Sequence, residues 1–180
     1  MDEKRPSKIK EIFSWIMTIV LAVVAAKLIN NYVILKAEVP TGSMENTIQV
    51  DDCIMGLRVA YLLSEPERGD IVIFPWPDDP EITYVKRIIG LPGETVEIKD
   101  GAVYIDGIAL EEEYLKEEMR GSYGPYEVPE GCYFMLGDNR NSSADSRRWD
   151  NKYLKREDIE AKVIFRYSPD FYWFPEVNYE

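Results

Sequence analysis

Near its N-terminus the chain carries an almost continuous run of apolar residues. Only two hydroxyl residues interrupt it between positions 12 and 26, and after Lys27 the apolar character continues to Leu35. A helix that crosses a membrane needs about 20 mostly apolar residues. Residues 12–35 therefore predict a single transmembrane helix. Because the residues before it are mainly basic, the tail at 1–11 is predicted to be cytoplasmic and the remaining chain to lie outside.

Two other interpretations of this run stay open. The small residues Val24-Ala25-Ala26 follow a short apolar run, as in a secretion signal that is cleaved off. A buried amphipathic helix is the second alternative. The apolar pattern continues beyond Ala26 and leads almost directly into a turn motif at residues 39–48. An uncleaved anchor is therefore the favoured interpretation.

From residue 36 onward, short apolar runs alternate with turn residues. Runs rich in β-branched and aromatic side chains predict strands. They lie at 52–59, 71–74, 82–89, 95–98, 102–105, 132–136 and 161–166. The runs at 95–98 and 102–105 flank the turn residues Lys99-Asp100-Gly101, which predicts a β-hairpin.

The segments between these strands are polar. Residues 111–120 are highly charged and predict a short exposed helix or a loop, and residues 121–131, rich in Gly, Pro and Tyr, predict irregular structure. Residues 155–160 predict one helical turn. Because no long helical period appears in this part of the chain, the predicted fold class is mainly β. We expect one antiparallel-sheet domain over residues 36–180, with a small hairpin and loop region at about 100–135.

Charge is distributed unevenly along the chain. The formal net charge is −12, and because residues 1–35 contribute +2, residues 36–180 carry −14. An acidic body argues against nucleic acid as a partner, since phosphate binding requires a basic surface. It also argues against broad contact with anionic lipid headgroups.

Two residue counts restrict the possible chemistry. The chain contains no histidine, which excludes catalytic arrangements of the Ser-His-Asp and Cys-His types and zinc hydrolases with histidine ligands. A hydrolase without histidine must take its base from a carboxylate, a lysine, a tyrosine or an amine. The two cysteines, Cys53 and Cys132, form either one disulfide or two free thiols. Two thiols are the favoured interpretation.

A turn motif follows the apolar segment. In Pro40-Thr41-Gly42-Ser43, proline and glycine favour a tight turn in which a backbone N–H can approach a ligand closely. Ser43 is therefore a candidate nucleophile. Serine is nevertheless common in glycine-containing turns, so this motif by itself indicates only a turn.

Lys86 is a candidate base. It lies between Val85 and the apolar pair Ile88-Ile89 in a run with strand character, so its side chain can point into the interior. Burial penalises the charged ammonium form and lowers the pKa of a lysine, and a neutral amine can accept the proton of a serine hydroxyl. The commoner alternative is a lysine on the exposed face of an edge strand.

A third candidate segment lies at residues 137–147. It is dense in small polar residues and in charges of alternating sign. This pattern predicts either a solvated surface loop or a polar scaffold that fixes a catalytic lysine through hydrogen bonds.

Behind an apolar N-terminal segment, these stretches together resemble the bacterial type I signal peptidases. The resemblance covers residues 12–166 and is closest to the compact form in Gram-positive bacteria. Four segments match the family's nucleophile box, structural strand box, general-base box and Gly-Asp-Asn-Arg…Ser-x-Asp-Ser-Arg box, in the order 40–44, 68–72, 84–93 and 137–147. One departure is Asn46, where many members carry proline. That position shapes a turn and takes no part in the chemistry.

The resemblance implies the catalytic roles. Ser43 would attack the scissile carbonyl and become acylated, while neutral Lys86 would take its proton and then activate the water that releases the acyl group. The backbone N–H of Ser43 and the hydroxyl of Thr41 would form the oxyanion hole. Ser143 would orient Lys86 through a hydrogen bond. The pair of Asp145 and Arg147 would hold the site together.

The resemblance also implies the substrate and the cellular location. Shallow apolar pockets would explain a preference for Ala-x-Ala before the cut, and the residues that would line them are Val39, Met44, Ile48, Tyr84 and Val85. The implied partners are preprotein signal peptides and the lipid bilayer, with the secretion machinery as a further candidate. The implied location is the plasma membrane, crossed once. No metal and no cofactor is implied.

Two other functions remain as alternatives. A self-cleaving repressor-type peptidase also uses a Ser-Lys pair on a similar fold, but it is cytoplasmic and usually carries a DNA-binding module. The apolar segment, the acidic body and the 137–147 box disfavour it. A non-catalytic, membrane-anchored β domain is the second alternative, but it would have no reason to bury Lys86 opposite a turn serine.

The short connection between anchor and motif predicts a nucleophile near the membrane. Ser43 follows Leu35 by eight residues, which an extended chain spans in at most about 29 Å. Three aromatic residues, Phe74, Trp76 and Trp149, are hypothesised to dip into the bilayer surface. Packing in the core is the equally weighted alternative for them.

Overall fold

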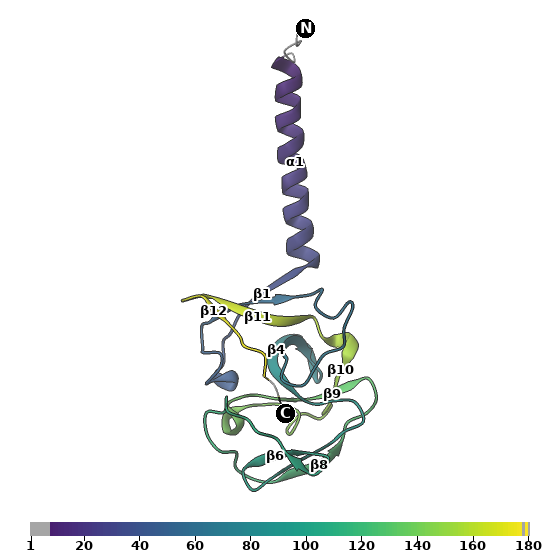
Figure 1. Ribbon diagram of the computed structural model, residues 1–180, viewed down its shortest axis with the longest axis vertical. Coiled ribbons are helices and arrows are strands. Elements are labelled where there is room, and N and C mark those ends of the chain that lie inside the picture. Colours follow the sequence, from purple (N-terminus) through teal and green to yellow (C-terminus); the bar gives the residue numbers. More distant parts are fainter. Residues whose placement is uncertain (1–7, 178, 180) are drawn as a thin grey trace.

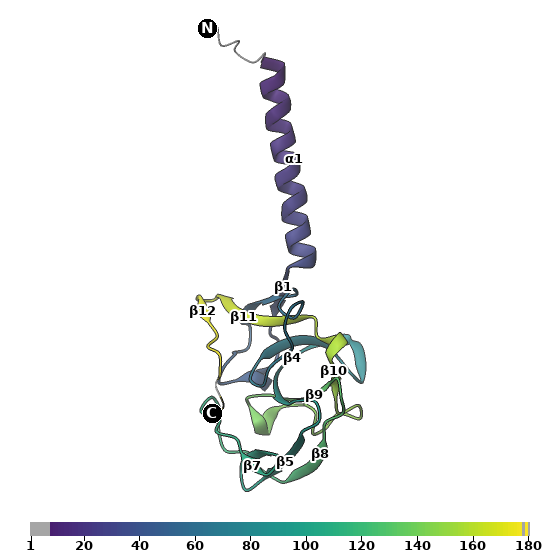
Figure 2. The ribbon, with the colours of Figure 1, turned by 45° about the vertical axis from the view of Figure 1, so that its right-hand side comes forward.

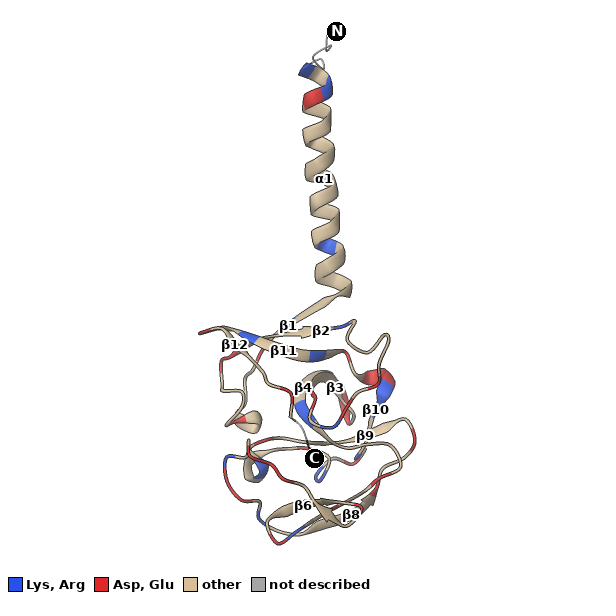
Figure 3. Ribbon diagram, in the orientation of Figure 1, with Lys and Arg blue, Asp and Glu red and all other residues tan. Residues whose placement is uncertain are grey.

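A long helix stands away from a β-rich domain in the computed structural model, which describes residues 8–177 and 179 (Figure 1). The helix α1 spans Lys8–Tyr32, and none of its residues is buried. By length and composition it can cross a membrane. Apart from Lys27, the charged residues of the helix lie near its N-terminal end, and charged residues are frequent in the domain (Figure 3). Part of the predicted 1–11 tail, residues 1–7, lies outside the described residues.

The surroundings of α1 test two details of the prediction. A buried amphipathic helix has one face covered by the protein, whereas α1 has no buried residue, so that alternative is wrong. The helix also ends before Leu35, the residue at which the anchor was predicted to end. The helix ends at Tyr32, and Ile34 and Leu35 already pair with Leu57 and Gly56 in a sheet.

The domain consists of two antiparallel sheets, which confirms the predicted fold class. In the described residues the larger sheet has the order β1-β2-β11-β3-β4-β9-β10, with β12 paired to β11, and the smaller has the order β7-β6-β5-β8. The strands of the larger sheet are β1 Ile34–Glu38, β2 Cys53–Leu57, β3 Ile71–Trp76, β4 Asp79–Gly90, β9 Cys132–Leu136, β10 Leu154–Lys155, β11 Ala161–Ser168 and β12 Tyr172–Trp173. Those of the smaller sheet are β5 Thr95–Lys99, β6 Ala102–Ile105, β7 Ile108–Ala109 and β8 Tyr123–Glu127.

The predicted hairpin is confirmed as β5 and β6. Lys99 pairs with Ala102 across the two-residue turn Asp100-Gly101, where both residues have positive φ, 51° and 80°. This is the combination that a type I′ turn requires, and its twist matches that of the flanking strands. Buried and partly exposed positions alternate along both strands. The smaller sheet lies at the end of the domain opposite α1 (Figure 2).

One segment between the predicted strands differs from the prediction by containing a further strand. Residues 121–131, predicted to be irregular, contain β8, whose Tyr126 pairs with Val96 of β5. Pairing with a neighbouring strand thus overrides the local preference of Gly and Pro for irregular backbone. Residues 111–120 form a loop without helix or strand, one of the two predicted alternatives. The single helical turn predicted at residues 155–160 is confirmed as a 3-10 turn, Arg156–Asp158.

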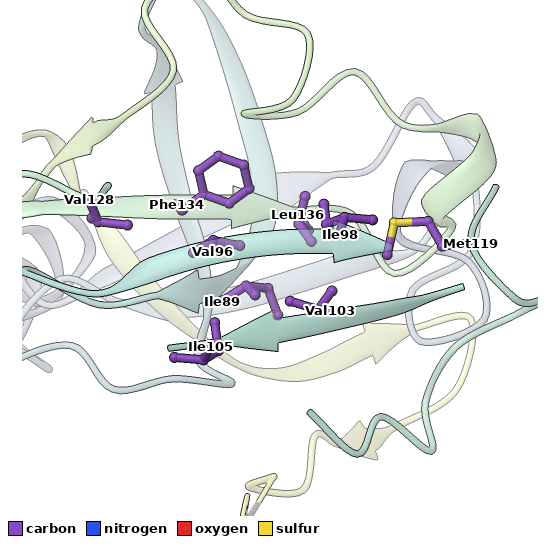
Figure 4. Packing of buried hydrophobic residues seen from close by; sticks show 9 residues of the cluster. All are labelled: Ile89, Val96, Ile98, Val103, Ile105, Met119, Val128, Phe134 and Leu136. Atoms are coloured by element: carbon purple, nitrogen blue, oxygen red, sulfur yellow. The ribbon is translucent and has the colours of Figure 1, made fainter. Parts of the chain in front are cut away.

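Three clusters of buried side chains form the core. One of them joins the smaller sheet to the ends of β4 and β9 (Figure 4), and its buried members are Ile89, Val96, Ile98, Val103, Ile105, Met119, Val128, Phe134 and Leu136. A second cluster lies among β1, β2, β3 and β11 and includes Val39, Met44 and Ile48. Cys53 and Cys132 are free thiols.

The third cluster corrects the hypothesis about membrane-dipping aromatics. Phe74 and Trp149 are buried, with ring centroids 5.9 Å apart, and Trp76 is partly buried and stacks on Tyr84 at 5.4 Å. The first two therefore have no surface to offer to a bilayer. The prolines at 75, 77 and 80 suggested a loop around Trp76, but β3 continues through Pro75 to Trp76 and carries Phe74 into the interior.

Candidate active site

Ser43 lies in a single 3-10 turn, η1, which spans Gly42–Met44. The loop at 137–147 holds this turn from the other side of the site. The backbone N–H of Asn139 donates to the Ser43 carbonyl at 3.1 Å, and its side-chain Nδ2 donates to the Gly42 carbonyl at 2.9 Å. The nucleophile motif and the 137–147 loop, about a hundred residues apart in sequence, are thus joined directly at the candidate nucleophile.

Lys86 reaches Ser43 from strand β4. Its Nζ donates to Ser43 Oγ at 2.7 Å and to the carbonyl of Val85 at 2.9 Å. Lys86 pairs with Val72 of β3 on one side, and pairing with β9 on the other side begins only at Arg87. The lysine therefore sits where β4 passes from a free edge into the interior of the sheet, and its side chain is 3% exposed.

Burial changes the acid–base properties of Lys86. Desolvation lowers the pKa of its amine from 10.5 to about 8, although the charges of Asp145 and Asp138 oppose this change. An amine with that pKa is neutral in about one molecule in ten at pH 7, far more often than an exposed lysine. The geometry thus brings a serine hydroxyl within hydrogen-bond distance of an amine that can accept its proton.

Thr41 lies beside the serine. It precedes η1 in an extended conformation, and its Oγ1 is 3.5 Å from Ser43 Oγ. The N–H of Ser43 belongs to the first turn of a helix, where backbone donors have no partner within the helix. Two donors, a hydroxyl and a backbone N–H, are therefore available close to the hydroxyl of Ser43.

Gly137 lets the 137–147 loop approach Ser43, the candidate nucleophile. A Cβ at this position would overlap Ser143 Oγ and the carbonyl oxygen of Ser43. Ser143 is buried beside it, and within the part of the chain that the structure describes its Oγ has no hydrogen-bond partner. The expected hydrogen bond from Ser143 to Lys86 is therefore not formed in this structure. Instead, Ser143 packs against Gly137, next to Ser43.

Two buried ion pairs surround the Ser43–Lys86 pair. Asp145 accepts two bonds from Arg147, at 2.8 and 2.7 Å, which is the pairing expected from sequence. Asp138 accepts two bonds from Arg87, at 2.9 and 2.6 Å, and sequence reasoning missed this pair. The signal was available, because Arg87 follows the candidate base and Asp138 lies in the polar loop. Nothing in the spacing, however, showed that the two segments meet.

A cleft of about 770 Å³ opens onto the pair. Its walls come from β1 and from the residues 82–86 of β4, and Ser142 and Ala144 of the 137–147 loop line it as well. Among the expected pocket residues, those that line the cleft are Val39, Tyr84 and Val85. Met44 and Ile48 do not line it, because both are fully buried in the same core cluster as Val39.

Comparison with known proteins identifies the family. A family model described as "Signal peptidase, peptidase S26" matches residues 12–168. The chain belongs to this signal peptidase family. A probable signal peptidase I-2 from Synechocystis sp. is 38% identical over 157 residues, 84% of this chain and 71% of the relative. A signal peptidase I from Bacillus licheniformis is 39% identical over 156 residues, 81% of this chain and 83% of the relative.

A crystal structure of a signal peptidase I from Enterococcus faecalis V583 is also similar, at 38% identity. The match covers 55% of this chain and 97% of that one, with a TM-score of 0.49. The resemblance to bacterial type I signal peptidases is confirmed by the family match and by these relatives. This signal peptidase is therefore a serine-type enzyme, which disfavours both the repressor-type peptidase and the non-catalytic anchored domain. Within the described residues one helix, α1, is long and apolar enough to cross a membrane, and together with the family this supports a membrane protein.

The burial of Lys86 predicts an effect on stability. Because the pKa of the amine is lowered from 10.5 in the unfolded chain to about 8 in the folded one, the unfolded state binds the proton more tightly. The folded state is consequently least stable below pH 8 and gains stability as the pH rises toward 10.5. Lys86→Met removes this penalty, so we expect the variant to be more stable at pH 7 by about 1 to 3 kcal/mol.

Urea unfolding of the detergent-solubilised protein at pH 7 and pH 10 measures this effect. The difference between Lys86→Met and the native protein should shrink at pH 10. Lys155→Met is the matched control, because the Lys155 side chain is 66% exposed, and it should change the free energy of unfolding by less than about 0.5 kcal/mol at either pH. A variant that is no more stable than the native protein at pH 7 would contradict the prediction.

Proposed function

We propose that this protein removes N-terminal signal peptides from preproteins as a membrane-bound endopeptidase, with Ser43 as nucleophile and Lys86 as general base. The observation that carries the proposal is the 2.7 Å hydrogen bond between Ser43 Oγ and a buried Lys86 amine, at the wall of an open cleft. Family membership supports the reaction class. The chain has no histidine. Within the described residues, Lys86 is the only basic side chain that is hydrogen-bonded to the hydroxyl of Ser43.

The reaction would proceed in two halves. As Ser43 Oγ attacks the scissile carbonyl, neutral Lys86 accepts its proton, and the Val85 carbonyl keeps the amine oriented. The negative charge that develops on the carbonyl oxygen is stabilised by the Ser43 N–H and the Thr41 hydroxyl. Lys86 then gives the proton to the leaving amine, which departs and leaves an acyl-enzyme. In the second half Lys86 activates a water molecule, which releases the acyl group and restores Ser43.

The cleft fits an extended peptide. Strand β1 pairs with β2 on one side only, and residues 79–85 of β4 pair only with β3, so each strand has a free edge in the described structure. A substrate chain in extended conformation can hydrogen-bond to such edges. Val39 and Val85 offer apolar lining near Ser43, and the fully buried Met44 and Ile48 fill the space behind it. A shallow pocket of this kind favours small side chains, as in Ala-x-Ala before the cut.

We also propose that α1 is retained as an anchor, with its N-terminus in the cytoplasm and the domain on the outer face. Strands β11 and β12 lie at the end of the domain where the chain joins α1 (Figures 1 and 2). Three aromatic residues there are exposed, namely Phe171, Tyr172 and Trp173, at 66%, 44% and 60%. Aromatic side chains are enriched at the membrane–water interface. They replace the buried Phe74 and Trp149 as candidates for bilayer contact.

Substitution of Ser43 or Lys86 tests the proposed catalytic pair. In detergent–lipid micelles the purified native protein should cut a preprotein with an Ala-x-Ala site after the second alanine. Ser43→Ala and Lys86→Met should each lower kcat by at least about a thousandfold, because each removes one member of the unit that transfers the proton. Substantial activity in Lys86→Met would refute the lysine as base. Lys155→Met serves as the control for loss of a positive charge.

The pH dependence of kcat/KM tests the role of Lys86 as the base. Only the neutral amine of Lys86 accepts a proton, and its pKa is about 8. Consequently kcat/KM should fall about tenfold for each pH unit below that value and level off above it. A profile of kcat/KM between pH 5 and pH 10 measures this. A flat profile between pH 6 and pH 9 would mean that Lys86 does not supply the base.

Binding to lipid vesicles tests the proposed membrane contact of the exposed aromatic residues. Replacing Phe171 and Trp173 by serine should weaken binding of the protein to vesicles at least severalfold, measured by flotation of a form lacking residues 1–33. Replacing the exposed Ile108 by serine is the control, because β7 lies at the end of the domain opposite α1 (Figure 2), and it should not change binding. Equal flotation of native and aromatic variants would remove these residues from the membrane contact. Mass spectrometry of the full-length protein after expression tests whether α1 is retained.

A further inference from the structure

A loop with no assigned role runs beside the active site. Residues 111–120, named here the strap, contain no helix or strand in the structure. Within it, Glu112 forms a two-pronged ion pair with Arg140 of the 137–147 loop, with distances of 2.7 and 2.5 Å. The two side chains are 3% and 0% exposed. A fully buried bidentate pair has a fixed geometry, and removal of either partner leaves the other charge uncompensated.

Arg140 connects this ion pair to the nucleophile. Its Nε donates to the carbonyl of Gly137 at 3.1 Å, and Gly137 is packed directly against Ser143 Oγ and the carbonyl oxygen of Ser43. Two residues further on, Asn139 donates to the same Ser43 carbonyl. A displacement of Arg140 would therefore move the peptide segment against which the turn of Ser43 rests.

The Arg140 guanidinium depends on Glu112 for its counter-charge. Burial alone would lower the pKa of Arg140, but the hydrogen bonds and charge of Glu112 raise it. The nearest other carboxylates of the site are already committed, since Asp138 is paired with Arg87 and Asp145 with Arg147. Within the described residues, Glu112 is the sole carboxylate bonded to Arg140.

The rest of the strap contacts the other parts of the site. The guanidinium of Arg87, next to the base, lies over the ring of Tyr114 at 4.0 Å. Lys116 pairs with Glu45, two residues after the nucleophile, at 2.6 Å. The side-chain amide of Asn141, in the 137–147 loop, accepts one hydrogen bond from the backbone of the strap and donates another to it. The strap thus touches the nucleophile turn, the base strand and the polar loop.

We propose that Glu112 is a positioning residue of the cleavage reaction, which acts by holding Arg140 and thereby the Gly137 peptide against the turn of Ser43. The proposal rests on the proposed function. Neither Glu112 nor Arg140 lines the substrate cleft, so the effect falls on the alignment of Ser43 with Lys86 and leaves substrate binding unchanged. Small misplacements of reacting groups cost large factors in rate.

The test uses the full chain in detergent–lipid micelles with an Ala-x-Ala preprotein. Glu112→Gln keeps the shape of the side chain and removes its charge. We expect kcat to fall about 10- to 100-fold while KM stays within about threefold of the native value. Glu117→Gln is the matched control from the same strap, because Glu117 pairs with Arg120 at the surface, and it should leave both constants unchanged. An unchanged kcat in Glu112→Gln overturns the proposal.

A second variant separates positioning from stability. Replacing both partners, Glu112→Met with Arg140→Met, removes the buried charges together and should restore the unfolding midpoint in urea. It does not restore the bond from Arg140 Nε to Gly137, so kcat should stay low. Native kcat in the double variant would show that the pair only stabilises the fold. If both variants fail to fold, the pair holds the domain and the proposal is likewise overturned.

The activity of the native protein in the same assay shows which of the two proposals fails. If the native protein does not cut the preprotein, the proposed function fails, whatever the variants do. If it cuts and the Glu112 variants cut equally well, only the role of Glu112 fails.

Discussion

The structure depends on keeping one amine out of water beside a serine hydroxyl. Lys86 is buried, and desolvation is the main cause of its lowered pKa. Any uncompensated negative charge nearby would work in the opposite direction and protonate the amine. Asp138 and Asp145 are close enough to do so, yet each is bound by two nitrogens of an arginine. Much of the polar architecture around the site can be understood as a means of holding carboxylates near a neutral lysine.

This arrangement has a thermodynamic cost that is concentrated at the site. A buried amine with a lowered pKa destabilises the folded state at neutral pH, and paired buried charges contribute little net stability. The stability of the domain must therefore come from elsewhere, and the three apolar clusters are well placed to supply it. One of them unites the smaller sheet with β4, the strand that carries Lys86. Packing distant from Ser43 and Lys86 thereby offsets the cost of burying the amine.

The sequence was sufficient to predict most strands, the hairpin turn and the family, because these depend on local patterns. Asp100-Gly101 specifies its turn through the two residues alone, and Ser43 and Lys86 stand in short motifs. Features that depend on tertiary contact were missed. The contact between Glu112 and Arg140 joins positions 28 residues apart, and β8 forms only because β5 offers a partner. Phe74 and Trp149 show the same limit, because their burial comes from packing against each other in a core cluster, a contact between distant parts of the chain.

The free edges of β1 and β4 have a further consequence, for self-association. An open strand edge invites pairing with any extended chain, including another copy of the protein. On β1 the exposed positions are occupied by Lys36 and Glu38, and charged residues on an edge strand disfavour aggregation through that edge. A short peptide segment can still reach the edge, whereas a second sheet would have to bury both charges. The edge of β1 can therefore accept an extended substrate chain without pairing with the sheet of a second copy of the protein.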